Sequence, residues 1–321
     1  MSAPTTDNPN PPASAHENLG FTSPRGGVDW SEYSVYRPIY QPSFFNRIYS
    51  YHSSKPSPVS PSWSIAHDVG AGHGIVSSSL AAKFSRVIVS EPNPSYSATA
   101  QELLIHKAGW PEDKFAFLNE GAEKSFVEDA SVDLITACEC LHFADSDAAM
   151  ENFARELKPG GTLVVTYYAQ PTIVGNEAAQ EIWRRLYRAF ADREISPVFT
   201  RALRVASSGY DAVGIPAGKF EGVKRVYVNA SKGIASFLAG DVAAESKVGE
   251  GEERVWVHGD KDWCDDEGQG VEYFKKYIAT WIPPIPEDDV KDLWDEMERV
   301  LDGGKVRTET PLVMLLATRR A

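Results

Sequence analysis

The sequence predicts an α/β fold: a doubly wound, Rossmann-like sheet of seven mostly parallel strands, with an antiparallel closing hairpin and helical cap elements. Three observations support this prediction. An apolar run ends in an acid and a glycine cluster, Asp68-Val-Gly-Ala-Gly-His-Gly74, and apolar residues at helical spacing follow. Strand-like runs then alternate with helical patterns, which is typical of a parallel sheet. The apolar run at residues 310–318 reads as a closing strand.

Composition limits the kind of partner. The chain has 321 residues, of which 42% are hydrophobic, so it can bury a large core. A formal net charge of -13 and an isoelectric point near 5.1 disfavour long-range attraction to nucleic acid or an anionic membrane, because both are polyanions. We therefore expect a small-molecule substrate, no nucleic acid and no membrane, while the sequence leaves the oligomeric state open.

Cysteine usage indicates the compartment. The three cysteines, Cys138, Cys140 and Cys264, are too few and too scattered for a disulfide framework. No second cluster of Cys or His completes a zinc site with the first pair. No apolar run approaches the roughly 18 residues that a membrane helix needs. We expect a cytoplasmic protein without a metal.

The N-terminal region predicts a tail and then a covering segment. Residues 1–27 are rich in Pro, Ser, Asn, Thr and Ala and lack an apolar core segment, which predicts a disordered tail. Apolar residues from Phe44 to Tyr49 stand at helical spacing. Residues 30–40 before them either close over a pocket as a lid or simply pack on the core.

The glycine cluster admits two cofactors. A dinucleotide fingerprint, Gly-x-Gly-x-x-Gly, would place its third glycine where Ile75 stands. This chain has Gly70-x-Gly72-x-Gly74 instead, and Asp68 would accept from amine or amide donors but repel a phosphate. The pattern resembles motif I of the class I S-adenosylmethionine (SAM) dependent methyltransferases, Asp-x-Gly-x-Gly-x-Gly. An NAD-dependent oxidoreductase is the alternative.

The next strands fit the same sheet. Residues 86–91 form a β-branched run that ends in Glu91 about 20 residues after the glycines, where an acid can accept from both ribose hydroxyls. A helix follows Pro92, and residues 115–118 predict the third strand. Residues 131–143 predict the fourth strand and its exit.

The second half predicts a cap and the end of the sheet. Residues 162–168 predict the fifth strand, residues 176–191 an amphipathic helix, and residues 222–229 a sixth strand that pairs with the closing strand. The acidic stretch 241–270 predicts a mostly solvated insertion.

Further motifs strengthen the resemblance. Gly121-Ala122-Glu123 is an abbreviated match to a turn that lies against the adenine in these methyltransferases. His142-Phe143 stands where the family often has His-Trp, and Leu157-Lys-Pro-Gly-Gly161 is similar to a family signature. The segment Tyr33-x-x-x-Arg37-Pro-x-Tyr40 resembles the fungal trans-aconitate methyltransferase-like group, in which it forms a lid.

The resemblance implies a site. The residues that it assigns to the cofactor SAM are Asp68, Gly70, Ala71, Gly72, Glu91, Pro92, Ala122, Glu123 and Cys138. Those that it assigns to the substrate are Tyr33, Arg37, Phe143, Trp183 and Trp281. Tyr187 could also line the pocket, but its helical spacing favours a core position.

The chemistry of methyl transfer selects the catalytic candidate. Transfer from a sulfonium is an in-line displacement that needs alignment and exclusion of water, and it needs no metal. A phenol or alcohol must lose its proton, and His142 after the fourth strand is the candidate base, with a pKa near the usual value of about 6.5. A carboxylate needs no base but suits an arginine, which could be Arg37, Arg184 or Arg201.

The sequence therefore predicts a SAM-dependent methyltransferase that acts on a small organic molecule by O-methylation of a carboxylate or hydroxyl. A catalytically inactive SAM-binding regulator or scaffold is the alternative outside catalysis. The predicted organisation is a tail (1–27) and one methyltransferase domain (28–321), divided into a lid helix (28–62), a SAM-binding core (63–169), a cap or insertion with strand six (170–307) and a closing strand (308–318).

Overall fold

The computed structural model describes residues 30–54, 60–193, 196–239, 243–281 and 284–321. The predicted tail, residues 1–27, lies outside the described residues. Within the described ranges, no helix has the length and apolar character that crossing a membrane requires.

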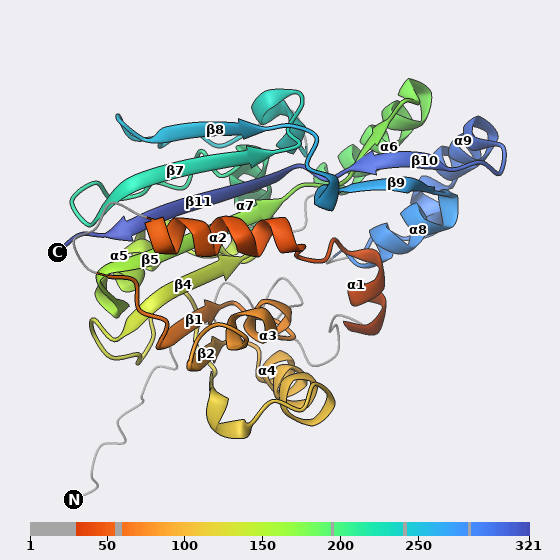
Figure 1. The fold of residues 1–321 in the computed structure, drawn as a ribbon. Helices are drawn as coiled ribbons and strands as arrows, with labels where there is room; N and C mark the ends of the chain where they lie inside the picture. The colour runs from red at the N-terminus through yellow and green to blue at the C-terminus, as the bar shows by residue number, and fades with distance from the viewer. Residues whose placement is uncertain (1–29, 55–59, 194–195, 240–242, 282–283) are drawn as a thin grey trace, which may run out of the picture.

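The main sheet of the described chain has eight strands in the order β3-β2-β1-β4-β5-β11-β7-β8 (Figure 1). Its strands are β1 (Ile65–Val69), β2 (Arg86–Ser90), β3 (Phe115–Leu118), β4 (Val132–Cys138), β5 (Leu157–Tyr168), β7 (Phe220–Val228), β8 (Glu253–Val257) and β11 (Leu312–Arg319). From β3 to β5 neighbouring strands are parallel, whereas β11 runs antiparallel to both β5 and β7. Parallel strands place their carboxyl ends at one edge, where a doubly wound sheet binds its ligands.

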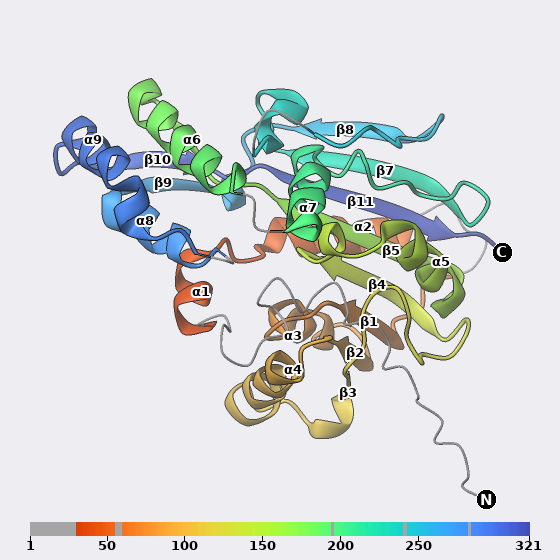
Figure 2. The same ribbon diagram turned by 180° about the vertical axis from the view of Figure 1, so that it is seen from behind.

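Helices cover both faces of this sheet. They are α2 (Pro42–Ser54), α3 (Ile75–Ala81), α4 (Pro94–Gln101), α5 (Ser146–Glu156) and α7 (Pro197–Ser207). Helix α2 lies in front of the sheet in Figure 1, whereas α5 and α7 lie in front when the molecule is seen from behind in Figure 2.

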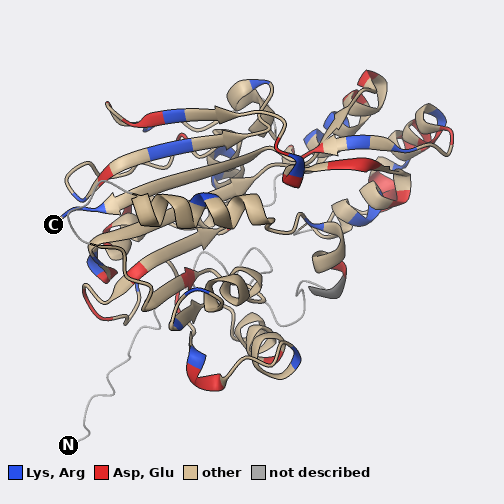
Figure 3. Ribbon diagram, viewed as in Figure 1, with Lys and Arg blue, Asp and Glu red and all other residues tan. Residues whose placement is uncertain are grey.

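Strand β11 shows how the two faces are filled. Leu312, Met314 and Leu316 belong to the apolar cluster under α2 and α3. Val313 and Leu315 belong to the cluster under α5 and α7. Successive side chains of a strand point to opposite faces, so an unbroken apolar run supplies both clusters. The charged residues of β5 and β11 lie toward their ends (Figure 3).

A cap stands beyond the carboxyl ends of β4 and β5. It contains a three-stranded sheet of β6 (Thr172–Val174), β10 (Val306–Glu309) and β9 (Cys264–Gln269), together with α6 (Glu177–Ala191), α8 (Val271–Ala279) and α9 (Lys291–Leu301). These three helices share a third apolar cluster that is rich in aromatic rings. Helix α1 (Trp30–Tyr36) lies next to α8, so the start of the described chain meets the cap (Figure 1).

The structure confirms the predicted fold class, with one strand more than predicted. Residues 253–257 of the acidic stretch form β8, which pairs in parallel with β7 at the sheet edge, and residues 264–269 form β9. The insertion is mostly solvated as predicted, since only Trp263 and Gly268 of its described residues are buried, but the prediction did not include these two strands. Backbone hydrogen bonds to the neighbouring strands, and not a buried apolar face, hold these segments in their sheets. In β8, for example, every residue is either exposed or half-buried.

Candidate active site

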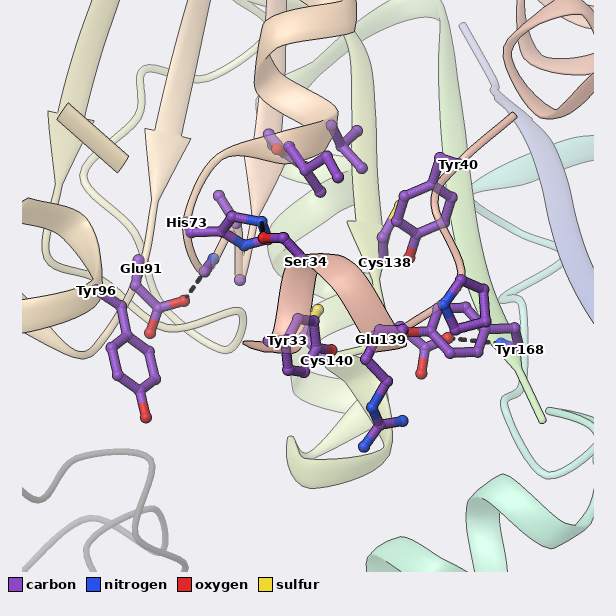
Figure 4. Close-up of a pocket in the computed structure, with 18 of the residues that line it drawn as sticks. Tyr33, Ser34, Tyr40, His73, Glu91, Tyr96, Cys138, Glu139, Cys140 and Tyr168 are labelled. Atoms are coloured by element: carbon purple, nitrogen blue, oxygen red, sulfur yellow. Dashed lines mark hydrogen bonds between the residues drawn. The ribbon is translucent and has the colours of Figure 1, made fainter. Parts of the chain in front are cut away.

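Two adjoining cavities lie at the carboxyl ends of β1, β2, β4 and β5. The first, here called the glycine-turn cavity, is lined by Tyr33, Ser34, Arg37, Pro38, Ile39, Tyr40, Asp68, Gly70, Ala71, Gly72, His73, Ile75, Val76, Glu91, Pro92, Tyr96, Cys138, Glu139, Cys140, Phe143 and Tyr168 (Figure 4). The second, the aromatic cavity, is lined by Tyr33, Arg37, Glu139, His142, Phe143, Tyr167, Tyr168, Gln170, Tyr187, Phe190, Phe199, Ala202, Leu203, Ala206, Tyr277, Thr280 and Trp281. Their shared wall consists of Tyr33, Arg37, Glu139, Phe143 and Tyr168.

The glycines of the turn after β1 are required by geometry. Gly70, Gly72 and Gly74 have φ values of 64°, 56° and 85°, which side-chain-bearing residues rarely adopt. A Cβ on Gly70 would also lie 2.5 Å from the Cβ of Cys140. The turn is fastened to β2, because the Ala71 N–H donates to the Ser90 carbonyl over 3.0 Å. The backbone of this turn therefore forms one wall of the cavity.

Glu91 ties the end of β2 to the glycine turn. One carboxylate oxygen accepts from the Gly72 N–H and the other from the Asn93 N–H, each over 3.0 Å. Burial raises the pKa of Glu91, and these two hydrogen bonds oppose that shift. The predicted acid is thus at the cavity, and each of its oxygens keeps a lone pair for a ligand hydroxyl.

Asp68 is the second acid of this cavity. Its two oxygens accept from the hydroxyls of Ser77 and Thr136, over 2.6 and 2.8 Å. Burial raises the pKa of Asp68 to about 6 in spite of these bonds. Two carboxylates in one cavity suit a ligand with hydroxyl and amino donors and would repel a phosphate.

The shared wall contains a carboxyl group, that of Glu139, which the sequence motifs did not identify. Glu139 follows β4 in the left-handed region, with φ of 57°, and its Oε1 accepts from the Tyr168 N–H over 2.5 Å. Burial raises the pKa of Glu139 to about 8, although the Tyr168 bond and nearby Arg37 lower it. The signal was a charged residue in the apolar exit of a buried strand, Cys138-Glu139-Cys140.

Arg37 stands beside Glu139 in this wall. Its Nε donates to Thr280 Oγ1 over 2.7 Å, and its guanidinium carbon lies 4.9 Å from the centre of the Tyr277 ring. In the parts of the chain that the structure describes, Arg37 makes no ion pair. The structure therefore brings Tyr33, Arg37 and Phe143, three of the predicted substrate residues, to the junction of the cavities.

Aromatic rings build most of the second cavity. Trp281 packs with its ring centre 5.0 Å from that of Tyr187 and 4.5 Å from that of Phe190. Trp281 was predicted to line the substrate pocket, and it does line this cavity. Tyr187, whose helical spacing favoured a core position, lines it as well.

His142 lines only the aromatic cavity. Its Nδ1 lies 2.8 Å from the Tyr210 hydroxyl, and 8% of the residue is exposed. Burial lowers the pKa of His142 to about 3. The expectation of a pKa near 6.5 is therefore wrong, because an imidazolium at this position would lose its hydration without gaining a counter-ion.

Trp183 is the first predicted site residue that the structure places elsewhere. Its side chain is fully buried in the cap cluster, and its Nε1 donates to the Pro171 carbonyl over 2.7 Å. It borders neither cavity. Trp183 and Tyr187 share helix α6, and it is Trp183 that packs on Phe274 and Tyr277 of α8.

Ala122 and Glu123 also lie away from the two cavities. Ala122 is buried in the apolar cluster under α5. Glu123 Oε1 accepts from the backbone N–H of Asp145, the N-cap residue of α5, over 3.0 Å. This turn therefore fastens α5, and its predicted contact with the cofactor stays a prediction.

Among the candidate arginines, Arg184 and Arg201 are exposed. Arg184 pairs with Glu181 on the surface of α6, and Arg201 donates to the Phe143 carbonyl. Of the three, only Arg37 borders the glycine-turn cavity or the aromatic cavity.

The open parallel sheet, the glycine turn after β1 and the acid after β2 define an α/β protein of the Rossmann-like class. Comparison with known proteins identifies the family. A family model described as a methyltransferase domain matches residues 67–165. Methyltransferase cfoB of Aspergillus candidus is 30% identical over 310 residues, which cover 90% of this chain and 94% of that protein. Methyltransferase gedG of Aspergillus terreus is 27% identical over an alignment that covers 99% of this chain and 99% of that protein. The chain therefore belongs to the class I SAM-dependent methyltransferases.

A solved structure supports the fold alone. A putative type II methyltransferase from Anaeromyxobacter dehalogenans superposes with a TM-score of 0.51 at 17% identity, over 87% of this chain and 97% of that one. The family membership decides against the NAD-dependent oxidoreductase. The narrower likeness to trans-aconitate methyltransferases stays a prediction, since the two fungal relatives are named only as methyltransferases.

Proposed function

We propose that this methyltransferase transfers the methyl group of SAM to an oxygen atom, a carboxylate or a hydroxyl, of a small organic molecule. The observation that supports this proposal is the pair of adjoining cavities with one shared wall. A donor in one cavity and an acceptor in the other would meet at that wall, away from bulk water.

In this proposal the glycine-turn cavity holds the cofactor. Glu91 accepts from ribose hydroxyls, Asp68 faces the polar end of the ligand, and the turn backbone lets the ligand approach closely. The remaining predicted contacts in this cavity are Ala71, Pro92 and Cys138. When bound, SAM supplies an electrophilic methyl group on a sulfonium.

The aromatic cavity holds the acceptor. Its rings favour a flat apolar body by contact area. Gln170 lines this cavity, and in the described part of the chain its Oε1 is buried without a hydrogen-bond partner. An acceptor with a hydroxyl donor would satisfy it.

Two further proposals concern the division of the chain and its location in the cell. We keep the division into lid (28–62), cofactor core (63–169), cap (170–307) and closing strand (308–318), because α1 and the cap both line the aromatic cavity. We also propose a cytoplasmic location and a small-molecule partner, on the basis of the three free cysteines and the acidic composition.

Two measurements test the function. Calorimetry with S-adenosylhomocysteine (SAH) should detect one site per chain, and tritium from methyl-labelled SAM should enter a small molecule of a fungal metabolite extract. Binding without labelling would instead identify a SAM-binding regulator or scaffold, and absence of SAH binding would contradict the proposal as a whole.

A further inference from the structure

We propose that Glu139 is the general base that accepts the proton of the acceptor. The acceptor oxygen is therefore that of a hydroxyl group, and the product is a methyl ether. This inference rests on the proposed function and selects one of its two acceptor classes. It assigns a catalytic residue that neither the sequence motifs nor the family membership identify.

The position of Glu139 is the first support. It is one of the residues that border both cavities, so a group there can reach an acceptor oxygen that faces the donor. Its backbone is fixed, because its N–H donates to the Thr166 carbonyl over 3.1 Å while φ is 57°. A left-handed residue other than glycine directly after a strand is uncommon, and such conformations concentrate at functional sites.

The side chain is held by one oxygen only. Oε1 accepts from the Tyr168 N–H, a bond that is drawn in Figure 4. Within the described residues, Oε2 makes no hydrogen bond, and it is not completely buried. One oxygen thus orients the carboxyl group and the other is available to a ligand.

Arg37 is the charged neighbour of Glu139. The Arg37 guanidinium is directed to Thr280 by its Nε and by Nη2, which lies 3.4 Å from the Thr280 carbonyl. That edge of the guanidinium is therefore already used and does not present a free fork to a substrate carboxylate. Its charge instead favours the ionised form of Glu139 and of a deprotonating hydroxyl.

The phenols and thiols around Glu139 are neutral. Burial raises the pKa of each of them, which are Tyr40, Tyr167, Tyr168, Tyr187, Tyr210, Tyr277, Cys138 and Cys140. Tyr33 of α1 also lines this wall. The charged groups are therefore Arg37 and Glu139 in the shared wall, with the carboxyl groups of Asp68 and Glu91 in the glycine-turn cavity.

Glu139 is a far stronger proton acceptor than His142. Burial raises the pKa of the Glu139 carboxyl group to about 8 and lowers that of the His142 imidazole to about 3, because burial disfavours the charged form of each. A pKa near the working pH suits a general base, since the group can both accept and release a proton. His142 also lies off the glycine-turn cavity.

The proposed step balances. The acceptor oxygen forms a bond to the methyl carbon while the carbon–sulfur bond breaks and leaves its electron pair on sulfur. The hydroxyl proton moves to Glu139 Oε2, and the neutral acid returns it to solvent after the product leaves. A carboxylate acceptor is already ionised at neutral pH and would give Glu139 no proton to accept.

The first arm of the test reads the product. The metabolite extract is incubated with the protein and methyl-tritiated SAM, and the labelled product is then treated with mild alkali. A methyl ether keeps its label, whereas a methyl ester releases it as volatile methanol. Alkali-stable label supports the inference, and alkali-labile label overturns it while leaving the proposed methyl transfer intact.

The second arm uses Glu139→Gln, with Glu139→Asp as the conservative variant and Glu151→Gln on the distant α5 as the matched control. Glu139→Gln should bind SAH within about twofold of wild type and lose roughly 10² or more in kcat, while Glu139→Asp retains part of the rate. Wild-type kcat should rise with pH and level off above about 8, and the residual rate of Glu139→Gln should lack that inflection.

The outcomes separate the two proposals. Any of three results for Glu139→Gln would overturn the role of Glu139. They are a rate within threefold of wild type, a pH profile that keeps the inflection, and a loss of SAH affinity as large as the loss of rate. A wild-type chain that binds no SAH, or binds it and labels nothing, would overturn the proposed function and with it this inference.

Discussion

At the scale of the residue, the glycine turn shows that a motif glycine can serve packing as much as ligand approach. Gly70 has a positive φ, and the position of its missing Cβ is occupied by Cys140 from the loop after β4. The turn and that loop are therefore one unit, because the Cys140 thiol also lies 3.3 Å from the Val69 carbonyl. Moving either of them would reshape the glycine-turn cavity.

We expect Gly70→Ala to weaken SAH binding by about tenfold or more and to lower the melting temperature. Gly109→Ala is the matched control, because Gly109 has φ of 72° but nothing within 4 Å of its Cβ position. Both variants share the strain of a left-handed alanine, of order 1 kcal/mol, and only the first adds the clash with Cys140. Calorimetry and thermal unfolding would measure both. Equal effects of the two variants would show that the packing of the turn on Cys140 is unimportant.

Glu139 also predicts how stability depends on pH. Its pKa rises from 4.5 in the unfolded chain to about 8 in the folded one. A raised folded-state pKa gives stability that is fully present below 4.5 and is lost as pH rises through about 8. Asp68 acts in the same direction, and its contribution falls through about pH 6. His142 and His73 act in the opposite direction, because burial lowers their pKa from 6.5 to about 3 and about 4, so their effect makes stability rise with pH up to about 6.5. The window from about 7 to 8 therefore reports chiefly on Glu139.

In that window we expect the melting temperature of wild type to fall with rising pH and that of Glu139→Gln to fall less. Glu151→Gln should follow the wild-type slope, since Glu151 forms an exposed pair with Lys219. Parallel slopes of wild type and Glu139→Gln would mean that Glu139 is ionised throughout and would remove the pH basis for its role as a base.

The site was predictable from sequence only where backbone geometry dictates residue type. The glycines and Glu91 were found because a tight turn and a strand end restrict what can stand there. Trp183 was expected in the pocket and Tyr187 in the core, and the structure reverses them. Helical spacing cannot separate the two, because both lie on the apolar side of one helix. Glu139 was missed because its left-handed backbone, and not its sequence pattern, turns it toward the cavities.

At the scale of the element, helix α1 joins the glycine turn to the cap. Ser34 Oγ lies 3.3 Å from His73 Nε2 of the turn, and the Tyr273 hydroxyl of α8 donates to the Tyr36 carbonyl over 3.3 Å. A seven-residue helix is too short to be stable alone, so these contacts hold it. Its place on both cavities favours the lid over plain packing.

Truncation tests the lid. Removal of residues 1–38 should weaken SAH binding by about tenfold, or 1.4 kcal/mol, because Tyr33 and Arg37 leave both cavities. Removal of residues 1–27 alone is the control, and it should leave the affinity unchanged, since the described lining begins at Tyr33. Calorimetry on both chains gives the contrast. If the longer truncation binds SAH like the shorter one, α1 only packs on the core.

The acidic stretch shows where element prediction stops. Residues 253–257 carry Glu253, Arg254 and an exposed Trp256, so no buried face marks them as a strand. Their register with β7 is set by backbone pairing, and Trp256 stacks on Tyr227 across the two strands with ring centres 4.3 Å apart. Such an edge strand depends on a partner that a local pattern does not reveal.

At the scale of the whole molecule, the described chain has two apolar clusters on the main sheet and a third in the cap. The shared wall of the cavities lies where these parts meet: Glu139 and Tyr168 come from the sheet, and Arg37 reaches Thr280 at the end of α8. A ligand in the glycine-turn cavity therefore touches α1, which in turn contacts the cap.

This arrangement predicts that SAH binding is felt in α8, although no residue of α8 itself borders the glycine-turn cavity. At SAH concentrations of about 100 Kd, linkage adds about 2.7 kcal/mol to the folded state. Hydrogen exchange should then slow in β1, in α1 and in α8, whereas β8 at the far edge of the sheet should change little. Thr280→Val removes the hydroxyl that accepts from Arg37 Nε, so the response of α8 should shrink while that of β1 persists. If α8 exchanges equally fast with and without SAH in the wild-type chain while β1 slows, the cap is not coupled to the cofactor site, and the contact between Arg37 and Thr280 serves packing alone.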